Sequence, residues 1–327
     1  MKTSQKFFLL FGLVFAFLVV FSILVYFRIL DRYFSRLLIW GAIQSIIAIS
    51  LNLITGFTGQ LSLGQAGFVG LGAYTTAILT TQGWPFLFAL LPSLAIAGLA
   101  GFLVGWPSLR LRGDYLAIMT LGFGEIIRSL IINLPDLTGG ASGFKDIPGF
   151  HPDGDLNRLF LFLGIFISFF LVLFLVVNLI RSSYGRAIIS VREDEIAARS
   201  MGVDIQLVKI GAFTLSALIA GWGGALQAPF LNYLAPSSYD FLKSVDFVVI
   251  IVLGGMGSIT GTILAAFGLT YLQEWLRFLG DYRMVIYPLL MILMMLFRPQ
   301  GLMGGREWTL ETFIRKKISD SKVGNHG

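Results

Sequence analysis

The chain contains 327 residues, of which 56% are hydrophobic and 13% are charged, and its mean hydropathy is +0.82. Soluble domains carry about 25% charged residues, so this composition excludes an ordinary soluble protein and predicts an all-α, polytopic integral membrane protein. The chain has no cysteine and only two histidines, both in polar segments, so we expect no disulfide and no metal site. The formal net charge of +6 is typical of the basic cytoplasmic loops of membrane proteins, and we expect no nucleic-acid partner.

Apolar segments predict about ten transmembrane helices. The first covers residues 7–27, and its length and the lack of an obvious cleavage site favour a retained span over a signal peptide. The other nine predicted spans are 37–54, 61–81, 85–105, 115–134, 159–180, 210–230, 245–256, 259–274 and 284–297. We divide the chain into an N-terminal span and linker (1–36), a transmembrane domain (37–304) and a cytoplasmic tail (305–327).

A glycine-rich segment with uncharged polar side chains, residues 51–74, lies inside the long charge-free run 37–109. Backbone in lipid must satisfy its own hydrogen bonds, so a glycine-broken polar segment belongs against other protein or beside a watery cavity. One interpretation is close packing between helices, where small residues are common. The other is a solute pathway, whose candidate lining residues here are Asn52, Gln60, Ser62 and Gln65.

Two ionisable residues lie within the fifth predicted span. Glu125 and Arg128 are three residues apart, so they share a helix face and can form an ion pair. Ionisable groups inside a span are costly and usually face the protein interior. A functional role and a structural ion pair are both consistent with this pattern.

A second glycine-rich break, Gly254-Gly-Met-Gly257, separates the short eighth and ninth predicted spans. Gly254 and Gly255 are therefore further candidates for lining a pathway. Both breaks join an inward-running span to an outward-running one, which suggests the remnants of a parallel internal repeat. Paired broken segments of this kind indicate the binding site in many transporters.

The distribution of Lys and Arg predicts the orientation of the chain. Cytoplasmic loops are enriched in these residues, and placing both termini in the cytoplasm puts most of the 24 basic residues on that side. Arg28, Arg32 and Arg36 contradict this pattern, because they fall on the outer side. The first hairpin is thus the one part of the predicted topology that the basic residues oppose.

A charged segment, residues 181–209, separates the sixth and seventh spans. Within it we predict one short helix over 192–202, because acidic residues occupy its first turn and Gly202 can end it. Glu195 and Arg199 are four apart, in the order that favours an ion pair. A helix this short is marginal in water, which favours docking on another surface through the apolar patch of Ile196, Ala197 and Met201. An ordinary solvated cytoplasmic loop is the alternative.

Four stretches of the chain carry a resemblance to one family. Glu195-Ile-Ala-Ala198 followed by Gly202 looks like the Glu-Ala-Ala…Gly coupling loop of bacterial ABC importer permeases. The other stretches are 55–74, with Gly59-Gln-Leu-Ser-Leu-Gly-Gln-Ala-Gly67, 137–143, with Thr138-Gly-Gly-Ala-Ser-Gly143, and 252–261, with Leu253-Gly-Gly-Met-Gly-Ser258. Together they are similar to the branched-chain amino acid permease family, specifically the longer member of the permease pair, over roughly residues 37–304.

The resemblance implies a permease subunit of an ATP-driven importer that carries leucine, isoleucine and valine across the bacterial inner membrane. It implies that the coupling residues to the ATPase are Glu195, Ala197, Ala198 and Gly202. The implied partners are a homologous second permease, two cytoplasmic ATPases, an extracytoplasmic solute-binding protein and membrane lipid. The chain has no Gly-x-x-x-x-Gly-Lys-[Ser/Thr] phosphate loop and no plausible nucleophile-and-base pair. We therefore expect no catalytic residues and no bound cofactor, with ATP used by the partner subunits.

The substrate and the energy source leave alternatives open. An uncharged polar path suits an aliphatic amino acid, because amide and hydroxyl groups can replace water at its headgroup without trapping it. Urea and short-chain amide permeases, however, share much of the same pattern. An ion-coupled secondary transporter would instead use intramembrane groups such as Glu125 or Asp246. A membrane enzyme or lipid-handling protein is a third class, recognised by activity on lipid without solute flux.

Overall fold

The computed structural model describes residues 31–108, 111, 113–151, 154–298 and 301–303. The first predicted span (7–27), Arg28 and the predicted tail (305–327) lie outside these residues. Within them the chain is helical, and its extended pairing is limited to an isolated antiparallel β-bridge between Phe144 and Leu234. This confirms the all-α prediction for the described part of the chain.

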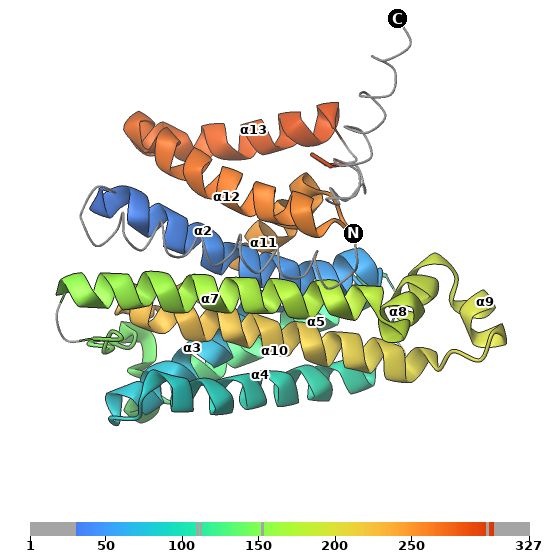
Figure 1. Cartoon of the computed structure of the whole chain (residues 1–327), viewed down its shortest axis with the longest axis horizontal. Helices are drawn as coiled ribbons and strands as arrows, with labels where there is room; N and C mark the ends of the chain where they lie inside the picture. The colour runs from blue at the N-terminus through green and yellow to red at the C-terminus, as the bar shows by residue number, and fades with distance from the viewer. Residues whose placement is uncertain (1–30, 109–110, 112, 152–153, 299–300, 304–327) are drawn as a thin grey trace, which may run out of the picture.

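Figure 1 shows the helices along the chain. They are α2 (Arg32–Leu51), the π-helix η1 (Asn52–Phe57), α3 (Gln65–Thr81), α4 (Phe86–Ser108), α5 (Asp114–Asn133), α6 (Pro135–Thr138), the 3-10 helix η2 (Gly140–Ser142), α7 (Gly154–Arg181), α8 (Ser183–Glu193), α9 (Glu195–Ser200), α10 (Ile205–Leu231), the 3-10 helix η3 (Pro236–Tyr239), α11 (Phe241–Gly254), α12 (Ile259–Trp275), the 3-10 helix η4 (Leu276–Tyr282) and α13 (Arg283–Phe297).

Five of the described helices are long and apolar enough to cross a membrane: Arg32–Phe57, Phe86–Pro107, Asp114–Asn133, Leu156–Arg181 and Ile205–Leu231. The other predicted spans beyond residue 30 fall on α3, α11, α12 and α13, which have 17, 14, 17 and 15 residues. At about 1.5 Å per residue, these four helices extend roughly 21–26 Å, less than a hydrocarbon core of about 30 Å. Ten membrane crossings therefore stay a prediction, and the described helices establish five candidates.

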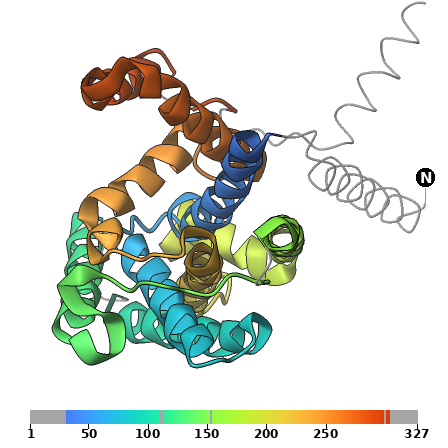
Figure 2. The same cartoon turned by 90° about the vertical axis from the view of Figure 1, so that its left-hand side faces the viewer.

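Helix α10 is the centre of the bundle. It packs along α3 and α4 and also contacts α2, and Figure 2 shows it surrounded by these helices and α7. Glycines allow this close packing, because a Cβ built on Gly72 of α3 would lie 2.1 Å from the carbonyl oxygen of Gly221 in α10. A Cβ on Gly224 of α10 would likewise lie 2.0 Å from the oxygen of Val69 in α3. At these positions the packing interpretation of the glycines is correct.

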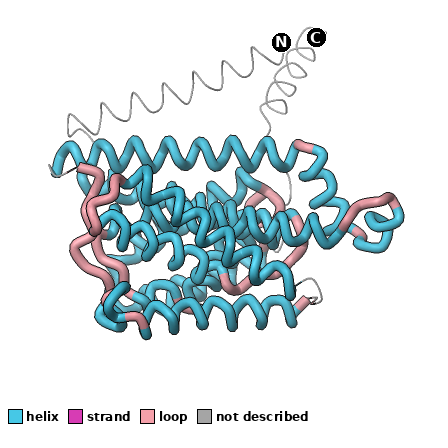
Figure 3. The backbone as a smooth tube through the Cα atoms, turned by 90° about the horizontal axis from the view of Figure 1, so that it is seen from below, coloured by secondary structure: helices cyan, strands magenta, loops and turns pink. Residues whose placement is uncertain are grey.

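The two ends of the bundle differ. Helices α8 and α9 project beyond the other helices at one end, called here the α9 end (Figure 1 and Figure 3). Helix α2 begins at the opposite end and runs toward the α9 end. The loop after α5 lies at the end where α2 begins and pairs with the chain that follows α10, since the amide of Phe144 donates to the oxygen of Leu234 at 2.9 Å.

Helix α11 starts inside the bundle rather than at its end. The amide nitrogen of Phe241, at its first turn, donates to Oε1 of Glu125 at 3.2 Å, and Glu125 lies in the middle of α5. The chain after α10 therefore returns partway into the molecule before α11 runs to the α9 end. Helices α12 and α13 pack outside α11 and α2 and form the outer arm seen in Figure 2.

Replacing Gly72 by valine is expected to destabilise the bundle by about 1–3 kcal/mol or more, because no side chain fits between α3 and α10. Gly268→Val in α12 is the matched control, since no atom lies within 4 Å of its built Cβ. The measurement is the melting temperature of detergent-purified protein followed by size-exclusion chromatography. Equal melting temperatures for the two variants would contradict the tight α3–α10 contact.

Candidate functional site

The first glycine break forms the end of α2 and the start of α3. Helix α2 widens into the π-helix η1, and the chain then runs without helical structure until Gln65. Side chains from other helices bind the freed amides: Leu63 N donates to Oγ1 of Thr120 and Ala66 N to Oγ of Ser244, both at 3.0 Å. The break is thus buried against protein, as the backbone requirement predicts.

Asn52 joins the first break to the second. Its Nδ2 donates to the oxygen of Ser258 at 3.0 Å and to Oγ1 of Thr262 at 2.9 Å, and its Oδ1 accepts from the amide of Gly257 at 2.9 Å. The side chain is only 1% exposed. The predicted path residue Asn52 therefore connects two helix junctions in this conformation and lines no open space.

The backbones of the two breaks are in direct contact. A Cβ built on Gly56 would lie 1.8 Å from Oδ1 of Asn52 and 2.5 Å from the amide nitrogen of Gly257. Gly257 has φ +82°, a conformation that favours glycine. A side chain at position 56 would therefore push the two breaks apart, and one at position 257 would strain the backbone.

Gly254 and Gly255 lie in a second close contact. A Cβ on Gly254 would be 2.6 Å from the oxygen of Gly261, and Gly255 has φ +105°. The segment 301–303 covers the same turn, since the amide of Leu302 donates to the oxygen of Leu253 at 2.7 Å. These two glycines therefore shape the α11–α12 junction. Their role in lining a pathway stays a prediction.

Arg192, in the last turn of α8, reaches this junction from outside. Its Nη1 donates to the oxygen of Gly56 at 2.8 Å. The same nitrogen would lie 2.8 Å from a Cβ built on Gly257, and the side-chain stem would lie 3.3 Å from a Cβ on Gly59. The charged segment and both glycine breaks, which are far apart in the sequence, therefore meet at one arginine.

The predicted single helix over 192–202 is wrong. The chain forms two helices, α8 ending at Glu193 and α9 covering Glu195–Ser200, with Asp194 extended between them. Asp194 caps α9, because its Oδ1 accepts from the amides of Ile196 and Ala197 at 2.8 and 3.0 Å. Aspartate competes with a helix interior by making this N-cap, which explains the break.

The predicted coupling residues lie on the turn that projects from the bundle. Glu195 forms an ion pair with the buried Nζ of Lys209 in α10. Ala198 is buried, Ala197 is exposed, and Gly202 ends the turn with φ +83°. The flanking side chains of Ile196 and Met201 are 79% and 84% exposed. One face of the turn is therefore fixed to α10 and the other presents apolar side chains to the surroundings.

Helix α8 is fixed to the same end of α10. The hydroxyl of Tyr184 donates to the oxygen of Val208 at 3.1 Å, and burial raises the pKa of this hydroxyl. A hydroxyl held protonated in this way keeps its donor at neutral pH. Both helices of the projecting segment thus have a polar anchor on α10.

The other candidate path residues are also buried. Gln65 is 1% exposed, and its Nε2 donates to Oγ of Ser50 at 2.6 Å and to Oγ of Ser216 at 3.4 Å. Oε1 of Gln60 and Oγ of Ser62 are buried, and neither finds a hydrogen-bond partner among the residues that the structure describes. A buried polar atom without a partner costs about 1–3 kcal/mol, so these two positions require an explanation.

Glu125 and Arg128 form the ion pair that their spacing predicts. Nε of Arg128 lies 2.8 Å from Oε2 of Glu125. The second carboxylate oxygen accepts from the first turn of α11, as described above. Both side chains are about one-third exposed, at 35% and 36%. Glu125 thus connects Arg128 on its own helix to the start of α11.

A cleft of about 350 Å³ lies beside the first half of α11. Its polar lining consists of Gln227, Ser237, Ser238, Asp240, Lys243 and Asp246, and its apolar lining includes Trp40, Leu231, Leu242 and Phe247. Nζ of Lys243 lies 3.5 Å from Oδ2 of Asp246. The cleft therefore offers both signs of charge next to an apolar wall.

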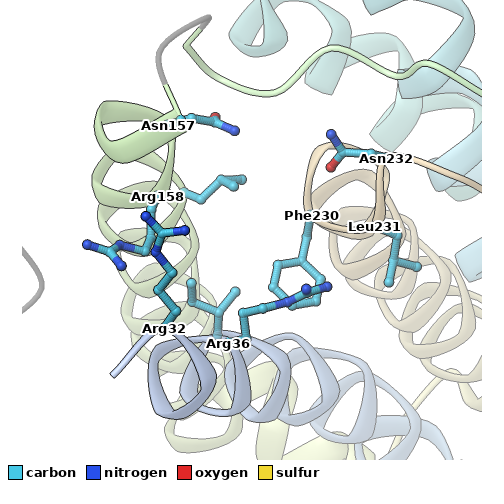
Figure 4. A pocket seen from close by; sticks show the side chains of 10 residues that line it. Arg32, Arg36, Asn157, Arg158, Phe230, Leu231 and Asn232 are labelled. Atoms are coloured by element: carbon cyan, nitrogen blue, oxygen red, sulfur yellow. The ribbon is translucent and has the colours of Figure 1, made fainter. Parts of the chain in front are cut away.

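A second, basic cavity of about 620 Å³ lies where α2 begins (Figure 4). Arg32 and Arg36 of α2, Arg158 of α7 and Asn232 after α10 line it. Arg36 lies over the ring of Phe230, 5.7 Å from its centroid. Arg32 and Arg36 thus lie at the end of the bundle opposite α9.

Two contacts of the projecting segment, those of Arg192 and Lys209, could not be assigned from the sequence. Arg192 belongs to the charged segment, but local spacing gives no sign that it reaches Gly56, 136 residues away. Lys209 is 14 residues from Glu195, beyond any helical spacing rule. The one available signal was the basic residue in the last turn of α8, a position that suits bonding to carbonyl groups at helix ends. Among the described residues, no group of three or more His, Cys, Asp or Glu side chains could hold a metal ion.

Comparison with known proteins places these features in a family. The family model "Branched-chain amino acid transport system / permease component" matches residues 33–296. The high-affinity branched-chain amino acid transport system permease protein LivM of Escherichia coli (strain K12) is 39% identical over 287 residues, covering 80% of this chain and 68% of its own.

More distant relatives match a similar share of this chain. The probable branched-chain amino acid transport permease protein LivM of Methanocaldococcus jannaschii is 23% identical, covering 82% of this chain and 92% of its own. The autoinducer 2 import system permease protein LsrD of Klebsiella pneumoniae is 25% identical, covering 85% and 86%. No solved structure matches the chain. The match over most of the chain shows that it belongs to the branched-chain amino acid transport system permease family.

Proposed function

We propose that this chain is a permease subunit of an ATP-driven importer of leucine, isoleucine and valine in the bacterial inner membrane, with both termini in the cytoplasm. The observation that carries the proposal is the α9 turn, whose apolar side chains Ile196 and Met201 project from one end of the bundle. Lys209 fixes the opposite face of this turn to α10, a candidate membrane span. A force applied at the turn is therefore passed to the bundle.

The occupant that we propose for this turn is a cytoplasmic ATPase subunit. Glu195, Ala197, Ala198 and Gly202 give the turn its shape, while Ile196 and Met201 provide its contact surface. A homologous second permease, a second ATPase and an extracytoplasmic solute-binding protein complete the assembly. The names of the relatives support an amino acid as substrate and a pair of permeases in the transporter, since both LivM and LivH proteins are among them. Hydrolysis takes place in the ATPases, so this chain is not an enzyme and binds no cofactor.

The solute contacts that we propose are in the cleft beside α11. A branched-chain amino acid carries a carboxylate, an ammonium and an apolar side chain. Lys243, Asp246 and the apolar wall around Trp40 match these three parts. The unpaired polar atoms of Gln60 and Ser62 lie in the first break, where they gain partners when the breaks separate and the solute passes. Asp246 is also the group that an ion-coupled transporter would use, which the reconstitution below distinguishes.

Placing a charge on the exposed face of α9 should weaken binding of the ATPases. The double variant Ile196→Asp with Met201→Asp is expected to retain about tenfold less ATPase in co-purification, because two apolar contacts become buried charges. Ser200→Asp, which adds a charge on the same exposed helix, is the matched control. Wild-type retention in the double variant would contradict docking on this turn.

Uptake should require the whole assembly. Proteoliposomes containing both permeases, the ATPases and ATP, together with the binding protein, are expected to accumulate radiolabelled leucine, isoleucine and valine, and to exclude urea. Omitting the ATPases should abolish uptake. Leucine uptake that needs no ATPase would instead identify an ion-coupled transporter, and urea uptake would identify an amide permease.

Removing the ammonium group of Lys243 from the cleft should reduce leucine uptake without affecting assembly with the ATPases. Lys243→Met is expected to lower leucine uptake about tenfold, the effect of one charged hydrogen bond, at unchanged ATPase retention. Lys145→Met, on the exposed loop after α5, is the matched control. Unchanged leucine uptake in Lys243→Met would place the solute outside the cleft.

A further inference from the structure

The side chain of Arg192 connects three parts of the chain that are distant in sequence. It comes from the last turn of α8, two residues before α9 begins. Its Nη1 donates to the oxygen of Gly56 in the first break, and the same nitrogen fills the space that a side chain of Gly257 would occupy in the second. Its Nε also lies 3.8 Å from Oε1 of Glu193, a long ion pair.

The guanidinium lies at the end of one helix and beside the turn that follows another. Gly56 is in the last turn of the continuous helix formed by α2 and η1, and Gly257 follows α11 by three residues. Helix C-terminal ends have unpaired carbonyl groups and a partial negative charge, which a cation stabilises. The positive charge therefore contributes in addition to the single hydrogen bond, and it acts on both breaks together.

The two breaks are joined to each other independently of Arg192. Asn52 bonds to Gly257, Ser258 and Thr262 across the junction. A displacement that reaches Gly56 is therefore passed to the start of α12. Since α8 contacts η1 and also carries α9, a displacement of the projecting turn reaches both breaks.

We propose that Arg192 is a positioning residue of the import cycle, which stays bound to Gly56 and transmits the displacement of α8 and α9 to both glycine breaks. The inference rests on the proposed docking of ATPases at α9, and it adds the contact through which their closure reaches the two glycine breaks. Arg192 does not contact the proposed docking face or the cleft. Its loss should therefore separate ATP hydrolysis from uptake without preventing either assembly or solute binding.

The first test measures the number of ATP molecules hydrolysed per leucine imported by the complete transporter in proteoliposomes. Arg192→Met, which keeps the stem, should raise this ratio about tenfold, the effect expected for one charge-assisted hydrogen bond. Arg192→Lys should give an intermediate ratio, because it restores the charge without the planar fork of donors. Arg186→Met, an exposed arginine of the same helix, should keep the wild-type ratio. A wild-type ratio in Arg192→Met would overturn the proposal.

The second test replaces the contact by a covalent bond. A Cβ built on Gly59 lies 3.7 Å from Cβ of Arg192, within the range of about 3.5–4.5 Å for a disulfide. The chain has no other cysteine, so Gly59→Cys with Arg192→Cys forms a defined pair. The reduced protein should be uncoupled, and oxidation should restore coupled uptake. Oxidation that blocks uptake instead would show that the contact must release, which contradicts transmission through a maintained contact.

The outcomes separate this inference from the proposed function. Leucine uptake by the wild-type transporter without ATPases would contradict the proposed function itself. Only the role of Arg192 would be contradicted by a second set of results. In that set, wild-type and Arg192→Met transporters are both coupled, and the oxidised cysteine pair is no better coupled than the reduced one. A variant that does not assemble is recognised because it retains little ATPase in co-purification. In that case the role of Arg192 is tested by comparing the coupling of the reduced and oxidised forms of the same cysteine variant.

Discussion

The contact between the backbones of Gly56 and Gly257 is the constraint on which the rest of this structure depends. It favours glycine at both positions: a Cβ on Gly56 would lie 1.8 Å from Oδ1 of Asn52 and 2.5 Å from the amide nitrogen of Gly257, and Gly257 has φ +82°. It ends α2 in a π-helix and α11 in a turn, and it brings the bonding groups of both ends to one place. π-helical turns of this kind are frequently found at functional sites. Arg192 then bonds to Gly56 beside Gly257, so α8 and the two breaks become neighbours.

The buried cation of Lys209 plays a complementary part on the outside of the bundle. Removing one member of a buried ion pair is strongly destabilising, because the remaining charge is left without a partner. Glu195 therefore has a structural reason to be acidic, separate from any contact with an ATPase. Glu195 thus has both an ion pair with Lys209 and a proposed place in the ATPase contact. A loss of coupling in a Glu195 variant alone would not distinguish these two roles. Ile196 and Met201 are the better probes of docking, because they are exposed and contribute little to the fold.

The sequence was sufficient for the helical class and the family, because hydropathy and short motifs are local signals. It was not sufficient for the roles of the polar residues in the two glycine breaks. Asn52 and Gln65 look like path-lining groups in a charge-free run, yet they bond to Thr262 and Ser216, about 210 and 151 residues away. Such partners depend on tertiary packing, which periodicity does not encode. The break at Asp194 could have been foreseen, because aspartate before a short helix is a capping signal.

The direct contacts that Asn52, Gly56 and Gly257 make across the junction are hydrogen bonds and glycine backbone contacts. The heat capacity of a protein transition follows the apolar area that becomes hydrated. Separation of these two helix ends would therefore carry a small heat-capacity change, unlike the unfolding of the surrounding bundle. The rate of a transport step limited by this separation would follow a nearly linear Arrhenius plot, even in a protein whose stability curves strongly with temperature.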